Sequence, residues 1–99
     1  MNMAKLTNNK RCTGIFVVQN DRGLHTRPST EIVKCATSFR SEVHLIYQKS
    51  YVNAKSLLGI LMLAATKGSK IQIEAEGEDA QEAVASLIAL AKNNFNIKY

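Results

Sequence analysis

The chain has 99 residues, of which 45% are hydrophobic and 21% charged, a composition that suits one soluble globular domain. No apolar run approaches the ~20 residues of a membrane span, and the polar N-terminus lacks a signal peptide's apolar core, so we expect a cytoplasmic protein without membrane insertion. The net charge of +5 is uneven, because residues 1–70 carry eleven Lys or Arg against three Asp or Glu, and residues 71–99 carry two against five. This asymmetry fits either a basic face for an acidic partner or an ordinary solvated surface.

The first half of the chain alternates strand-like and helix-like segments. Runs of strand-forming residues fill 12–18, 41–48 and 51–53. Between the first two runs, Q-N-D-R-G is a turn, and apolar residues then recur at helical spacing over about 26–38. Pro28 fits only the first turn of a helix, so this helix begins between His25 and Pro28.

The second half predicts a helix, a strand and a last helix. The first helix covers about 56–66, with Ser56 as its N-cap and a stop at Lys67-Gly68. Strict alternation over 71–76 predicts a strand with one wet face. The last helix begins at Asp79, with Glu82 as its capping-box partner. Its buried stripe comprises Val84, Leu87, Ile88, Ala91 and Phe95.

The resulting order is β-α-β-β-α-β-α, which predicts an α/β fold of the α+β type. Helices on one face of an antiparallel or mixed sheet would form a two-layer sandwich whose other face meets water.

Most common catalytic and metal motifs are missing from the sequence. It has neither a P-loop nor H-E-x-x-H, and no cysteine pair suited to zinc. His25 and His44 belong to different elements and do not suggest a metal pair, and Cys12 and Cys35 are expected to be reduced thiols. We therefore expect no metal and no cofactor.

The stretch G-L-H-T-R-P-S, residues 23–29, is the strongest candidate site. The start of a helix presents unpaired N–H groups and a partial positive charge, which favour an anion such as phosphate. Arg27 adds donors suited to phosphate oxygens, and a neutral imidazole at His25 is a nucleophile. The stretch therefore suits a phosphoryl group carried on His25. In the alternative, His25 merely caps the helix and Arg27 is a surface charge.

Two motifs in register resemble the HPr family, the histidine-containing phosphocarriers of the bacterial phosphoenolpyruvate:sugar phosphotransferase system. G-L-H-T-R-P-S resembles the family's active-site signature, and N-A-K-S-L-L-G-I-L-M-L, residues 53–63, resembles its regulatory-serine segment. The resemblance covers about residues 11–95. It leaves residues 1–10 as a flexible lead-in and residues 96–99 as a tail.

The resemblance implies an open-faced sandwich with four antiparallel strands and three helices on one face. It implies that His25 accepts a phosphoryl group at Nδ1 from phosphorylated enzyme I and passes it to the A domains of enzymes II for sugar uptake. Arg27 would stabilise the phosphate, and Ser56 would be phosphorylated by an HPr kinase/phosphorylase. Such a protein is a phosphoryl carrier, not an enzyme in the usual sense, and would act as a monomer.

The resemblance also implies a partner-binding surface. Its residues would be Thr26, Leu57, Leu58 and Leu61. Helically spaced leucines are usually core residues, but residues 57–63 are apolar nearly all round, so some of them must face outward.

Two other functions stay open. One is a signalling paralogue of HPr in a nitrogen-related phosphorelay. The other is a basic nucleic-acid-binding module, which the sequence disfavours because Phe16, Tyr47 and Tyr51 are scattered and suggest no aromatic pair for stacking bases. We therefore expect no nucleic-acid partner. The sugar, the acceptors and the roles of both terminal extensions cannot be predicted from the sequence.

Overall fold

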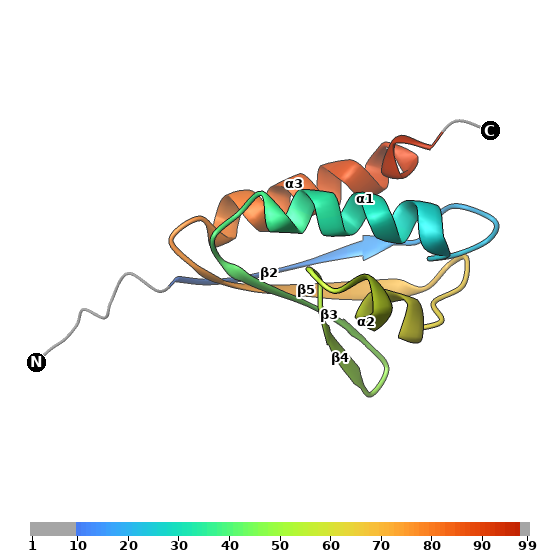
Figure 1. The fold of residues 1–99 in the computed structure, drawn as a ribbon, viewed down its shortest axis with the longest axis horizontal. Helices are drawn as coiled ribbons and strands as arrows, with labels where there is room; N and C mark the ends of the chain where they lie inside the picture. Colours follow the sequence, from blue (N-terminus) through green and yellow to red (C-terminus); the bar gives the residue numbers. More distant parts are fainter. Residues whose placement is uncertain (1–9, 98–99) are drawn as a thin grey trace, which may run out of the picture.

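The computed structural model describes residues 10–97, which form two layers, an antiparallel sheet and a set of helices (Figure 1). In chain order the elements are β2 (Lys10–Val17), α1 (Thr26–Thr37), β3 (Glu42–Tyr47), β4 (Ser50–Asn53), α2 (Leu57–Met62), β5 (Lys70–Gly77), α3 (Ala80–Lys92) and the short 3-10 helix η1 (Asn94–Asn96). The strand order is β2-β5-β3-β4, and every neighbouring pair is antiparallel. The predicted fold class and element order are confirmed. The predictions for residues 1–10 and 96–99 fall largely outside the described residues.

The alternation predicted for β5 places its apolar side chains under the helices. Ile71, Ile73 and Ala75 are fully buried, whereas Gln72 and Glu76 face solvent. Helix α3 packs so closely over β2 that a Cβ added at Gly14 would lie 2.6 Å from Val84 Cγ1. None of the helices among residues 10–97 is both long and apolar enough to span a bilayer.

Helix α2 is shorter than the predicted 56–66. Ser56 is its N-cap as expected, because its hydroxyl accepts the Gly59 N–H at 3.1 Å. The helix nevertheless ends at Met62, and Ala64 takes a left-handed backbone conformation with φ 51°. The following residues leave the helix and bond to the loop before α1, since Ala65 O accepts the Leu24 N–H at 2.9 Å.

The capping box predicted at the start of α3 is wrong. Asp79 occupies the N-cap position, but its side chain makes no cap hydrogen bond and Glu82 is exposed. The Asp79 carboxylate instead accepts the backbone N–H groups of Arg40 and Ser41, each at 2.9 Å, and the Ser41 hydroxyl. The Asp79 side chain therefore bonds to the loop before β3 and not to the first turn of its own helix.

The prediction that Phe95 belongs to the buried stripe of the last helix is right about its burial but wrong about its secondary structure. Helix α3 ends at Lys92, and Phe95 lies in η1 with a left-handed φ of 56°. The backbone makes a left-handed turn there, and the Phe95 ring is fully buried in an edge-to-face contact with Phe16, with ring centroids 5.9 Å apart. The residue thus belongs to the core, but it reaches the core through a turn.

Candidate functional site

His25 is the residue at which the chain enters α1. It occupies the N-cap position with an extended backbone, φ −79° and ψ −168°, and its carbonyl accepts the Ser29 N–H at 3.1 Å. The helix therefore begins at Thr26, between His25 and Pro28 as predicted. The half-buried His25 lies at the edge of the first turn.

The loop before His25 is pressed against the segment that follows α2. Gly23 has φ +70°, and a Cβ added there would lie 2.2 Å from Ala65 O. Leu24 is buried and donates its N–H to that same carbonyl. Only glycine combines this backbone angle with this close approach. Gly23 therefore allows the turn that places His25 at the start of α1.

Two buried side chains of this loop and helix were not assigned a role from the sequence. Asn20 Nδ2 donates to Gly23 O, and Ser29 Oγ donates to Leu24 O at 3.1 Å. Nothing in a single sequence reveals these contacts, because both depend on where the loop carbonyls point.

The first turn of α1 is suited to an anion. Pro28 has no N–H, and the N–H of Ser29 bonds to His25, so the amides of Thr26 and Arg27 are those for which the helix offers no carbonyl. This turn contains no acidic side chain, and exposed Arg27 has no ion-pair partner among residues 10–97. The partial positive charge of the helix start is therefore uncancelled by its own side chains.

Two cationic side chains lie in the segments next to the site, and one of them is paired with an acid. Exposed Arg22 lies in the preceding loop, and Lys67 Nζ lies 2.8 Å from Asp21 Oδ1. That hydrogen bond lowers the pKa of Asp21 and raises the pKa of Lys67, so each favours its charged form in the partner's presence.

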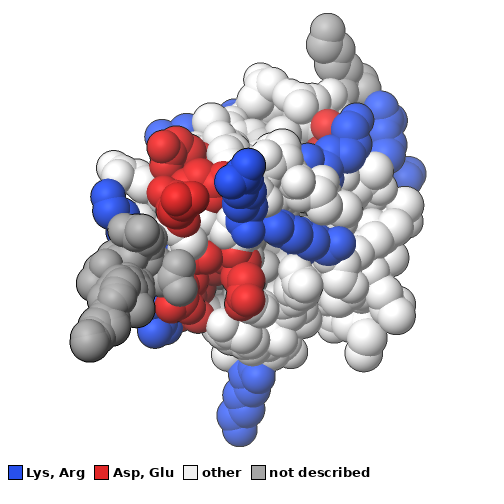
Figure 2. Space-filling model, turned by 60° about the vertical axis from the view of Figure 1, so that its left-hand side comes forward, with Lys and Arg blue, Asp and Glu red and all other residues white. Residues whose placement is uncertain are grey.

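The acidic residues gather elsewhere. The turn from β5 to α3 lies at the opposite end of the molecule from the start of α1 (Figure 1). Viewed from nearer that end, Figure 2 shows Asp and Glu side chains concentrated in one area, with Lys and Arg spread around it. The uneven charge of the sequence therefore corresponds to a separation in space, because this acidic cluster lies away from the end of the molecule that carries His25.

The second motif lies on a helix antiparallel to α1. Leu24 at the start of α1 bonds to Ala65 after α2, and Lys55 Nζ before α2 donates to Phe39 O after α1 at 2.9 Å. His25 is therefore near the end of α2, whereas Ser56 lies at its beginning. The structure places the two motifs on adjoining helices, with the length of α2 between His25 and Ser56.

Helix α2 carries an exposed apolar surface formed by Leu57, Leu58 and Met62, which we call the α2 patch. Leu58 is 69% exposed and Met62 72%, whereas Leu57 is just exposed and Leu61 is half-buried. Met62 was missed by the sequence analysis, and Leu61 contributes less than expected. The difference arises because α2 turns its buried side, marked by Ile60, toward the core. Thr26 is exposed in the first turn of α1.

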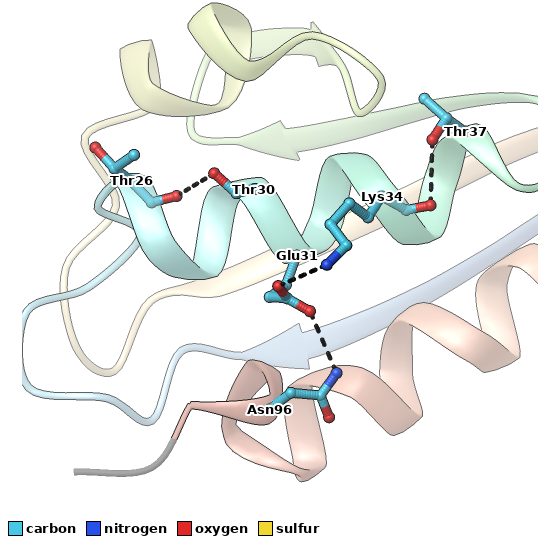
Figure 3. A network of polar contacts seen from close by, with 6 residues as sticks. All are labelled: Thr26, Thr30, Glu31, Lys34, Thr37 and Asn96. Carbon is cyan, nitrogen blue, oxygen red and sulfur yellow. Dashed lines mark hydrogen bonds and ion pairs between the residues drawn. The ribbon is translucent and has the colours of Figure 1, made fainter.

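Helix α1 is also tied to the C-terminal turn (Figure 3). Glu31 accepts from Lys34 Nζ at 3.4 Å and from Asn96 Nδ2 at 3.3 Å. In the first turn, the Thr30 hydroxyl donates to Thr26 O at 2.8 Å. The Asn96 bond therefore joins η1 to α1, the helix that carries the site, whereas the other two contacts lie within α1.

The open face of the sheet corrects one expectation. His44 and Tyr51 form a stacked pair with centroids 4.5 Å apart, although the sequence suggested no such pair. The Tyr51 hydroxyl donates to Glu74 Oε1 at 2.7 Å, and Arg11 also bonds to Glu74. A carboxylate beside the stacked rings is unfavourable for a nucleic-acid backbone.

Among the described residues no group of three or more His, Cys, Asp or Glu is arranged to hold a metal ion.

Comparisons with known proteins agree on one family. The family model described as the PTS HPr component phosphorylation site matches residues 13–93. The chain is 42% identical over 76 residues to a phosphocarrier protein HPr of Neisseria meningitidis, covering 77% of this chain and 85% of the relative. It is 52% identical over 65 residues to that of Buchnera aphidicola, covering 66% and 76%. Its fold matches the crystal structure of an HPr from Thermoanaerobacter tengcongensis with a TM-score of 0.83 and 32% identity, covering 89% and 99%.

Proposed function

Because the chain belongs to the HPr family, the phosphocarriers of the phosphotransferase system, we propose that His25 is the residue that carries its phosphoryl group. The observation that carries this proposal is the position of His25 at the start of α1. The amides of Thr26 and Arg27 accompany it there, with the Arg27 guanidinium, which has no ion-pair partner among residues 10–97. Phosphorus bonded to the imidazole would place its anionic oxygens in this positive field.

The transfer itself needs one nucleophilic nitrogen and a stabilised anion. The lone pair of His25 Nδ1 attacks the phosphorus of the phosphorylated donor, and an N–P bond forms. The bond between phosphorus and the donor breaks, and its electron pair stays with the donor. Arg27 and the helix amides stabilise the negative charge on the phosphoryl oxygens in the transition state of the transfer. The reverse exchange transfers the phosphoryl group to an acceptor and regenerates unmodified His25.

The partners we propose are enzyme I as donor and the A domains of enzymes II as acceptors. The α2 patch and Thr26 are exposed on adjoining helices, and exposed Arg27 lies in the first turn of α1. An apolar surface with polar and charged residues beside it suits partner docking. The relatives reported above are phosphocarrier proteins, so a signalling paralogue is not favoured.

We further propose that Ser56 is a regulatory site for an HPr kinase/phosphorylase. Ser56 lies at the start of α2, where its half-buried hydroxyl is the helix cap. A phosphate there adds about −1.5 to −2 charges beside the α2 patch. Because α2 separates Ser56 from His25, the added charge would act on partner docking and leave the chemistry at His25 unchanged.

Intact mass after incubation with enzyme I and phosphoenolpyruvate tests the proposal for His25. We expect one added phosphoryl group that is lost in mild acid, absent in His25→Ala and retained in His44→Ala, which changes the only other histidine. Wild-type protein that gains no mass beside an active enzyme I would refute the carrier function. A group that survives in His25→Ala would refute the assignment of the residue.

A further inference from the structure

Buried polar side chains concentrate around the backbone that precedes His25. Among the described residues four polar side chains are buried: Asn20, Ser29, Ser41 and Ser69. Burial of a polar group is unfavourable unless it makes a hydrogen bond, so each such residue needs a structural reason. Asn20 and Ser29 bond to the loop that precedes His25, and Ser69 bonds within the turn whose Ala65 carbonyl accepts the Leu24 N–H.

Ser29 holds both peptide units that meet at the His25 Cα. Its backbone N–H donates to His25 O at 3.1 Å, and its hydroxyl donates to Leu24 O, also at 3.1 Å. The first bond is available to any residue at this position of a helix except proline. The second requires a side-chain donor, and Ser29, fully buried, directs its hydroxyl to the carbonyl that precedes His25.

Asn20 bonds to the same loop directly, and Ser69 bonds to the turn that contacts it. Asn20 Nδ2 donates to Gly23 O, the carbonyl that also accepts the His25 N–H at 3.0 Å. The Asn20 Oδ1 atom is buried without a hydrogen-bond partner among residues 10–97, so only the donor half of this amide is used. Ser69 Oγ accepts the Thr66 N–H at 3.1 Å and shapes the turn whose Ala65 carbonyl receives Leu24.

We propose that the Ser29 hydroxyl is a positioning group for His25, acting through the Leu24 carbonyl. The inference rests on the proposed function of His25 as phosphoryl acceptor. Rotation of the Leu24–His25 peptide changes φ at His25 and swings the Cα–Cβ bond, which moves the imidazole relative to Arg27 and the helix amides. The hydroxyl opposes this rotation, so the His25 Cα–Cβ bond keeps one direction relative to Arg27 and the helix amides.

Packing alone does not account for a serine at this position. Alanine is nearly as large, is the strongest helix former and carries no polar group to bury. What serine adds is a donor, and this donor contacts the peptide next to His25. Compared with alanine, Ser29 therefore adds a hydrogen bond that orients the Leu24–His25 peptide.

The test compares Ser29→Ala and Ser29→Cys with wild type and with Ser41→Ala. Ser41 is the matched control, because it is equally buried but lies beyond the opposite end of α1 and bonds to Asp79. Transfer from phosphorylated enzyme I is measured over a range of carrier concentrations, so that kcat and KM separate. The 1H–15N resonances of the His25 imidazole and the thermal unfolding of each variant are recorded in parallel.

We expect kcat of Ser29→Ala to fall by roughly tenfold while KM changes little, because misplacement of a reacting group slows the chemical step. The His25 ring resonances shift or broaden, and Ser29→Cys, with a weak S–H donor, lies between Ser29→Ala and wild type. Ser41→Ala loses stability but keeps its kcat and its His25 resonances.

Wild-type kcat and unchanged His25 resonances in Ser29→Ala would overturn the proposal, as would equal slowing in Ser29→Ala and Ser41→Ala. Should Ser29→Ala not fold, wild-type kcat and resonances in Ser29→Cys would overturn it equally. Wild-type protein that accepts no phosphoryl group refutes the carrier function instead, and the imidazole resonances of the variants still decide whether Ser29 positions His25.

Discussion

Asp79 and Ser41, 38 positions apart in the chain, are joined by two hydrogen bonds that link the start of α3 to the loop before β3. The Asp79 carboxylate accepts the Ser41 backbone N–H and the Ser41 hydroxyl, and it also accepts the N–H of Arg40. Hydrogen bonds to the charged form, that of the Ser41 side chain first, lower the pKa of Asp79 from 3.8 to about 2.

This shift predicts an acid-dependent contribution to stability. A carboxylate with a lowered pKa in the folded state stabilises the fold above its unfolded pKa, and this stabilisation is lost as the pH falls through the folded value. Asp79→Asn should therefore be less stable than wild type at neutral pH, and the difference should shrink between about pH 4 and about pH 2. Urea unfolding from pH 7 to pH 2 measures it, and a difference independent of pH contradicts the assignment.

Arg27→Ala should slow phosphoryl transfer by roughly 100-fold, the usual effect of removing one donor to a developing anion. Its stability should change by less than about 0.5 kcal/mol, because Arg27 is exposed and unpaired among the described residues. Transfer rates and thermal unfolding are compared with Arg22→Ala, an exposed arginine in the adjacent loop. A large loss of stability in Arg27→Ala would show a structural role for the side chain.

Three substitutions at Ser56 separate its cap from its charge. Ser56→Ala removes the acceptor of the Gly59 N–H and should cost about 0.5–2 kcal/mol of stability. Ser56→Asn and Ser56→Asp both retain a cap acceptor, but only aspartate adds negative charge beside the α2 patch. We expect slower transfer from enzyme I in Ser56→Asp alone, measured by initial rates at low ionic strength. Equal rates for Asn and Asp would remove the regulatory role proposed for Ser56.

Leu58→Ser should weaken docking without destabilising the fold. Leu58 is largely exposed on the α2 patch, so little core packing is lost. Apolar contacts at the centre of an interface contribute about 1–3 kcal/mol, so KM for enzyme I should rise by about tenfold while kcat is retained. Ile15→Ser is the control, since Ile15 is comparably exposed on β2. A similar rise in KM for both variants would show that the α2 patch is not the docking surface.

Features that depend on contacts between near neighbours could be predicted from the order of the residues. The alternation in β5, the start of α1 at His25 and the Ser56 cap all involve residues two to four positions apart, so periodicity and cap chemistry predict them. Arg27 was predicted for the same reason, because it shares the first turn with the helix amides.

The way those elements pack against one another depends instead on contacts between residues far apart in the chain. The Asp79 carboxylate bonds to Ser41 and makes no cap hydrogen bond to its own helix, and α2 ends at Met62, after which Ala65 O accepts the Leu24 N–H. The exposed side of α2, and with it Met62, follows from where the core lies. The contacts of Asn20 and Ser29 depend on carbonyl directions set by the loop's packing. Such contacts join groups whose approach is governed by the whole fold, and no local pattern of residues encodes that approach.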